Sequence, residues 1–353
     1  MIRRIEFRQQ FNILVLFMIV QFGGLLIASL VYTTTPVSYI TSPSPSSGQV
    51  NTPQQALWFF VYLIIATLAI LLVFKIYHGD LLFSLFEGFV IVTASFFVFA
   101  TIIGYFMPNL SVGAVSIASL LIAIALVLIK NKYHILRNTV AIIASIGVGL
   151  VLGIDFGFAV AYFLVLIIAA YDYIAVFVTK HMLTLAKALS SRNLAFLIGS
   201  TDVEVIPKNF FNKKEFKEYG KYKKEIAKIK NPIIKKLIKQ GKLPLISQVQ
   251  LGAGDLGLPL MLAISSYKLS FNYFIPISVI IGSTVGMLFT MYIQKKYLIP
   301  LPAIPPLFSF MSIALGFALL TISWQSIYLA FVGLVVLLIF VYGAKRSAKN
   351  RSS

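Results

Sequence analysis

About ten apolar segments, each long enough to cross a membrane, divide this chain and constrain its fold more than any other feature. Hydrophobic residues make up 59% of the 353 residues and charged residues 12%, a balance that no soluble domain could bury in one core. The segments therefore predict an all-α polytopic membrane protein. They cover residues 11–32, 56–77, 82–107, 110–130, 137–154, 157–179, 246–267, 271–293, 303–322 and 326–343.

The segments predict one integral membrane domain. Residues 1–179 hold spans one to six, and residues 180–245 form a lysine-rich loop. Residues 246–343 hold spans seven to nine and an additional C-terminal span, and residues 344–353 form a basic tail. Only a short polar stretch around Gln325 separates the last two segments, which could be one long helix with an irregular centre. Two helices are favoured.

The basic residues predict the orientation, because loops rich in Lys and Arg remain in the cytoplasm. The formal net charge is +19, and the Lys and Arg residues lie between the apolar segments. With ten spans, the N-terminus, the 180–245 loop and the C-terminus are cytoplasmic, and Lys268 alone lies on an outside turn. The loop is rich in lysine, which favours contact with anionic lipid over a nucleic-acid partner.

Three acidic residues lie within the predicted spans: Glu87, Asp172 and Asp255. Glu87 lies near a cytoplasmic helix end and is expected to be solvated or to snorkel to the membrane surface, with lining of the cavity as the alternative. Asp172 and Asp255 lie at depths of about 10 and 14 Å from the cytoplasmic side, so their carboxyl groups can meet. Their helices contain no Lys, Arg or His at that depth, so structural ion pairing explains these carboxylates poorly.

Two adjacent carboxyl groups cannot both ionise easily, so they share a proton, as in aspartic proteases. The ionised group can deprotonate a water molecule while the protonated group donates to the scissile carbonyl. The residue types do not assign these two roles to Asp172 and Asp255 individually. Gly252 and Gly254 precede Asp255 and permit close backbone approach or local unwinding.

Other catalytic chemistries find little support in the sequence. The chain contains no cysteine and therefore has no thiolate nucleophile or cysteine metal site, and it has no His-Glu-x-x-His motif. We therefore expect neither a metal nor another cofactor. The alternative function is a secondary transporter or an ion-leak pathway that uses the same carboxylates. Transport would predict an internal repeat, and no convincing repeat is visible.

Two motifs resemble those of a known family. Tyr171-Asp172 in the sixth span and Gly252-Ala253-Gly254-Asp255 in the seventh resemble the YD and GxGD motifs of the presenilin and signal peptide peptidase proteases. The helix order and the hydrophilic loop between these spans are also similar, most of all to archaeal presenilin-like members. The family's Pro-Ala-Leu-Pro motif is approximated here by Pro302-Ala303-Ile304-Pro305.

The resemblance implies a presenilin-like bundle of nine core transmembrane helices, to which this chain adds its C-terminal span. It implies an intramembrane aspartic endopeptidase that cleaves within transmembrane helices of membrane proteins or signal peptides, with no obligatory partner evident from the sequence. Asp172 and Asp255 would be catalytic. The proline-rich segment, with its backbone expected to be non-helical, would border the active site. The supporting residues would be Tyr171, Gly252, Gly254, Pro302, Ala303, Ile304 and Pro305.

Overall fold

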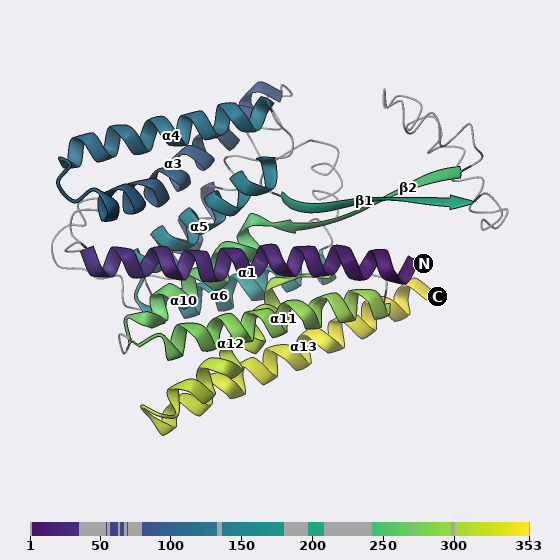
Figure 1. The fold of residues 1–353 in the computed structure, drawn as a ribbon. Helices are drawn as coiled ribbons and strands as arrows, with labels where there is room; N and C mark the ends of the chain where they lie inside the picture. Colours follow the sequence, from purple (N-terminus) through teal and green to yellow (C-terminus); the bar gives the residue numbers. More distant parts are fainter. Residues whose placement is uncertain are drawn as a thin grey trace. The chain divides into compact units, whose positions relative to one another are not determined.

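The computed structural model is mainly helical, with one pair of β-strands (Figure 1). It divides into two compact units, one of residues 1–13 and 199–250 and the other of residues 14–198 and 251–353. The second unit contains the candidate site. The structure describes residues 2–34, 54, 57–62, 64–66, 69, 80–132, 136–179, 197–207, 242–269, 272–297 and 301–352.

The helices follow the predicted order of spans. Seven described helices are long and apolar enough to cross a membrane, which confirms a polytopic membrane protein. The second predicted span is represented by an apolar helical stretch, Leu57–Ala66, and most of its remainder lies outside the described residues. The principal helices are α1 (Ile2–Thr34), α3 (Asp80–Phe106), α4 (Val112–Lys132), α5 (Arg137–Asp155), α6 (Phe158–Tyr173), α10 (Ala253–Tyr267), α11 (Phe274–Tyr297), α12 (Ile304–Leu319) and α13 (Ile327–Ser352).

Helix α10 lies at the centre of the second unit. It contacts α5, α6 and α11, and nearly all its residues from Leu256 onward are buried. Glycines on α5 allow the close approach of these two helices. A Cβ atom on Gly149 would lie 2.7 Å from Leu260, and one on Gly153 would lie 2.7 Å from Ile264. Small residues of this kind allow membrane helices to pack backbone against backbone.

The seventh span begins later than predicted. The apolar segment was expected to be helical from residue 246, but β2 occupies Lys242–Gly252 and α10 begins at Ala253. Strand β2 pairs with β1, Leu197–Pro207, which lies in the loop that was expected between spans six and seven (Figure 1). The physical signal is the near-alternation of apolar and polar residues in 243–251, a period of two that is typical of a strand.

The two C-terminal segments form separate helices, as favoured. Helices α12 and α13 lie side by side and are separated by a short 3-10 turn, Trp324–Ser326 (Figure 1). The expected basic tail is not separate, because α13 continues through it to Ser352. Near this end, Phe340 and Ala344 are fully buried with Ile293 of α11. Helix α13 is therefore packed into the bundle along both its halves.

Glu87 is not solvated, contrary to expectation. It is 4% exposed and forms an ion pair with Lys130 of α4, with 3.0 Å between the Lys130 Nζ and Glu87 Oε2 atoms. Glu87 lies near the start of α3 and Lys130 near the end of α4, and these two helices are consecutive and in contact. This proximity allows a buried charge to be neutralised by a partner instead of by water.

Lys268, the one basic residue on a predicted outside turn, joins α10 to the end of α5. Its ammonium group donates hydrogen bonds to the carbonyls of Ile154 and Phe156. Cations are favoured at a helix C-terminus because the last carbonyls there lack partners. Burial lowers the pKa of Lys268 to about 8, although the nearby charge of Asp155 partly opposes this shift. The residue therefore serves a local structural contact, which explains its departure from the charge pattern.

Candidate active site

Asp172 lies in the last turn of α6, at a change of helix type. Residues Ile174–Val178 continue the chain as a π-helix, in which each amide reaches one residue further back than in an α-helix. Such segments are rare and frequently occur at functional sites. The carboxyl group of Asp172 is partly buried.

Backbone amides at the start of α12 face this carboxyl group. The Ile304 amide donates a hydrogen bond to Asp172 Oδ2 at 3.3 Å, and the Ala303 amide also interacts with the carboxyl group. Helix α12 begins at Ile304, and the following Pro305 and Pro306 have no N–H groups. The few amides available at this helix terminus are therefore directed at Asp172.

Asp255 lies in the first turn of α10, as its third residue. Its Oδ2 atom accepts a hydrogen bond of 3.3 Å from the backbone amide of Gly252, the residue that precedes the helix. An acidic side chain at this position commonly turns back to the amide before the helix. The carboxyl group is thus held by its own helix terminus, and it remains partly exposed.

The two carboxyl groups come from separate helices and lie close enough for their charges to interact directly. Asp172 ends α6 and Asp255 begins α10, so both belong to the same end of the bundle. No Lys, Arg or His among the described residues forms a salt bridge with either carboxylate. Each carboxylate instead accepts backbone hydrogen bonds. Two neighbouring carboxyl groups can share a proton because their like charges disfavour ionisation of both.

The other predicted supporting residues are close in sequence to the two aspartates or to Ile304. Tyr171 is 40% exposed, and its ring lies 6.3 Å from that of Phe60 in an edge-on arrangement. Gly254 is exposed, and a Cβ atom there would meet no described atom within 4 Å. Close helix packing therefore does not explain this glycine, whereas Gly252 supplies the amide bound by Asp255. Pro302 is buried next to the N-cap residue Ala303.

The proline segment is less extended than predicted. Pro305 and Pro306 were expected to prevent helix formation, but they lie in the first turn of α12. Proline is tolerated there because amides of the first turn have no intrahelical partner. The backbone amide of Ile304 in this segment donates a hydrogen bond to Asp172.

One polar residue beside the site was missed from the sequence. Gln21 of α1 is fully buried and donates a hydrogen bond of 2.9 Å from Nε2 to the carbonyl of Leu256, the residue after Asp255. The available signal was an uncharged amide side chain in the middle of an apolar span, whereas the prediction considered charged residues in the spans. Amide side chains often join membrane helices by hydrogen bonds.

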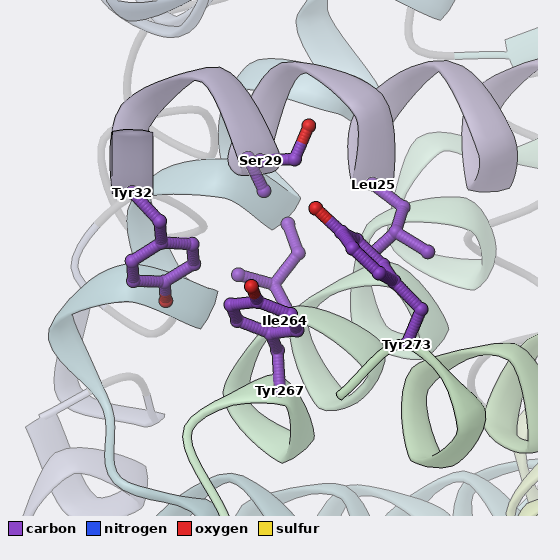
Figure 2. A pocket seen from close by; sticks show the side chains of 7 residues that line it. Leu25, Ser29, Tyr32, Ile264, Tyr267 and Tyr273 are labelled. Carbon is purple, nitrogen blue, oxygen red and sulfur yellow. The ribbon is translucent and has the colours of Figure 1, made fainter. Parts of the chain in front are cut away.

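A small pocket lies at the other end of α10 and is distinct from the carboxylate pair (Figure 2). Figure 2 shows Tyr32, Tyr267 and Tyr273 around it. The ring centroid of Tyr267 lies 5.1 Å from that of Tyr32 and 5.0 Å from that of Tyr273. None of its lining residues is acidic or basic. The pocket therefore contains no carboxylate like those of the candidate pair.

Comparisons with known proteins identify the family and the fold of the chain. The family model for signal-peptide peptidase and presenilin aspartyl proteases matches residues 14–319, so α13 lies outside the match. No curated protein sequence matches significantly. A crystal structure of a presenilin family intramembrane aspartate protease in space group C222 has a TM-score of 0.54 and 18% identity, covering 86% of this chain and 94% of that one. A second, in space group P2, has a TM-score of 0.57 and 17% identity, covering 88% and 97%.

The match covers both candidate aspartates and the proline segment, and the structural likeness extends over most of each compared chain. The apolar helices agree with an integral, multi-pass location in the membrane. The chain therefore belongs to the signal-peptide peptidase and presenilin family of aspartyl proteases, with the fold of its intramembrane members.

Proposed function

We propose that the chain is an intramembrane aspartic endopeptidase in which Asp172 and Asp255 form the catalytic pair. The observation that carries the proposal is the direct electrostatic interaction of two carboxyl groups from separate helices, in a chain of this family. Neither carboxylate forms a salt bridge with a described cation, so a purely structural ion pair does not account for them.

In the proposed reaction, one aspartate is ionised and removes a proton from a water molecule that attacks the scissile carbonyl carbon. The other aspartate is protonated and donates to the carbonyl oxygen. The carbon–nitrogen bond of the tetrahedral diol then breaks, the amine product takes a proton from one aspartate, and a diol hydroxyl group returns a proton to the other aspartate as the carboxylic acid forms. The amides of Ile304 and Gly252 hold the two carboxyl groups in position, and neither aspartate is assigned to one role.

The substrates are proposed to be transmembrane helices of membrane proteins or signal peptides. A helix encloses its peptide bonds, so the substrate must unwind locally before a water molecule can attack. A Cβ atom on Gly254 would meet no described atom within 4 Å, so the space beside it can receive an extended substrate backbone. The adjoining Pro302-Ala303-Ile304-Pro305 segment would form one wall of this region, and the exposed Tyr171 would contact the substrate.

The proposed orientation places the catalytic pair nearer the cytoplasm. The N-terminus, the basic 180–245 loop and the C-terminus would all lie on that side, where lysines contact anionic lipid. Because the chain lacks cysteine, single cysteines placed in each loop can be labelled from one side of a sealed vesicle. Labelling of the 180–245 loop from the outside of intact cells would contradict the proposed orientation.

The function is tested with purified protein in liposomes and a single-span peptide substrate. Wild-type protein and the matched control Asp155→Asn should cleave it, whereas Asp172→Ala and Asp255→Ala should not. An aspartyl transition-state inhibitor should block the wild type. Persistent cleavage in either alanine variant would refute the pair. A proton or cation flux that requires both aspartates, without proteolysis, would instead establish transport.

A further inference from the structure

A buried glutamine connects α1 to the turn that carries Asp255. Gln21 is 0% exposed and lies within the apolar span Gln10–Tyr32. Its Nε2 atom donates a 2.9 Å hydrogen bond to the carbonyl of Leu256. Its Oε1 atom is buried and accepts no hydrogen bond from any described residue. A buried amide that is only half satisfied is a poor choice for stability alone, because an apolar side chain would avoid its desolvation cost.

The bonded carbonyl belongs to a weakened part of α10. Pro259 lies inside this helix and has no N–H group, so the Asp255 carbonyl lacks its usual donor four residues later. The hydrogen-bond ladder is therefore interrupted at the residue that bears the candidate catalytic carboxyl group. Gln21 supplies a hydrogen bond from another helix to the next carbonyl, that of Leu256.

The same face of α1 contacts α10 one turn further along. A Cβ atom on Gly24 would lie 2.3 Å from Leu260 Cδ2, so the Leu260 side chain occupies the space that the glycine leaves. Gln21 and Gly24 are three residues apart and share one face of α1. The position of the first turns of α10 relative to α1 is thus fixed by a hydrogen bond and by a close contact.

We infer that Gln21 is a positioning residue, which holds the first turn of α10 so that the Asp255 carboxyl group faces Asp172. It acts through the backbone, since the Asp255 side chain itself is bound by the Gly252 amide. The inference rests on the proposed proteolytic function for its kinetic consequence. The effect of Gln21 on the direction of the side chain at residue 255 can be measured without catalysis.

The kinetic test compares Gln21→Met, which preserves size but removes both amide atoms, with Gln21→Glu, which can donate to the carbonyl when protonated. Loss of the bond should lower kcat about tenfold with little change in KM, the scale expected for one buried hydrogen bond. Gln21→Glu should recover activity as the pH falls, a pH dependence that Gln21→Met should lack. Ser29→Ala removes a hydroxyl group that bonds within α1 and serves as the matched control.

A second measurement is independent of activity. In this cysteine-free chain, Asp255→Cys introduces a single thiol, whose modification rate reports its exposure to the aqueous site. Adding Gln21→Met should change this rate at least threefold, whereas adding Ser29→Ala should not. An unchanged rate together with wild-type kcat would overturn the inference, as would a loss of thermal stability alone. If wild-type protein cleaves nothing, the proposed function fails, and the thiol rate still decides the role of Gln21.

Discussion

The backbone amide of Ile304 donates a hydrogen bond of 3.3 Å to the Asp172 carboxyl group, joining the start of α12 to the end of α6. Residues 172 and 304 are far apart in sequence, and the proline motif thereby acquires a physical role. The two prolines after Ile304 have no N–H group to donate. The Ile304 amide therefore links the carboxylate to the N-terminus of α12, where the helix dipole is positive.

Removing this amide should impair catalysis. Ile304→Pro deletes the N–H group at a helix position that tolerates proline, whereas Ile304→Ala shortens the side chain and retains the amide. Hydrogen bonds to charged groups contribute about 1.5–3 kcal/mol, so we expect Ile304→Pro to lower kcat by about tenfold or more relative to Ile304→Ala. Single-turnover cleavage measures this difference. Equal rates in the two variants would show that the amide contributes nothing.

Helix α13 should support the Asp172 end of α6, although it lies outside the family match. A Cβ atom on Gly343 would lie 2.7 Å from the Tyr173 hydroxyl oxygen, next to Asp172. Gly343→Val should displace Tyr173 and lower kcat about tenfold, the scale of a moderate overpacking cost. Adding Tyr173→Leu should recover part of the activity. Gly104→Val, where a Cβ atom meets no described neighbour within 4 Å, is the control; a similar loss there would contradict this account.

The buried ion pair of Glu87 and Lys130 should behave as a unit. Lys130→Met leaves the Glu87 carboxylate buried without this partner, so the free energy of unfolding should fall by about 3–5 kcal/mol. The double variant Glu87→Leu/Lys130→Met should be more stable than the sum of the single losses predicts. Denaturation in mixed micelles measures these values, with the exposed Lys345→Met as control. Additive losses would mean that the two charges are not coupled.

Lys268 should make stability depend on pH in a defined window. Its pKa is lowered to about 8 from 10.5, so the folded state loses this proton between pH 8 and 10.5 while the unfolded state retains it. Stability rises with pH wherever the unfolded state binds more protons. Wild type should therefore gain stability relative to Lys268→Met as the pH rises through this window. A constant difference in melting temperature would contradict the lowered pKa.

The sequence predicts the helices well because apolar length and loop charge are local properties. The predicted start of the seventh span was wrong because residues 243–251, which nearly alternate between apolar and polar, were included in the apolar segment and form part of strand β2 instead. The prediction that Glu87 is solvated was wrong because the residue pairs with Lys130, which lies on another helix.

The candidate aspartates could be selected from the sequence because few acidic residues lie at membrane depth. Their backbone donors could not, since the amide of Ile304 becomes available only where α12 begins. Gln21 was missed because its amide side chain is uncharged. Its hydrogen-bond partner is a backbone carbonyl, which the sequence pattern does not identify. Such contacts depend on how helices pack, which hydropathy does not encode.

The central claim, that Asp172 and Asp255 act as one pair, is tested most directly by kcat/KM for Asp172→Asn, Asp255→Asn and the double variant. Groups that act as a unit have non-additive effects, so each single substitution should reduce cleavage to the level of the double variant. Correct folding of each protein is checked by its melting temperature. Substantial cleavage by either single variant, or losses that multiply in the double variant, would show that the two carboxyl groups do not share one reaction.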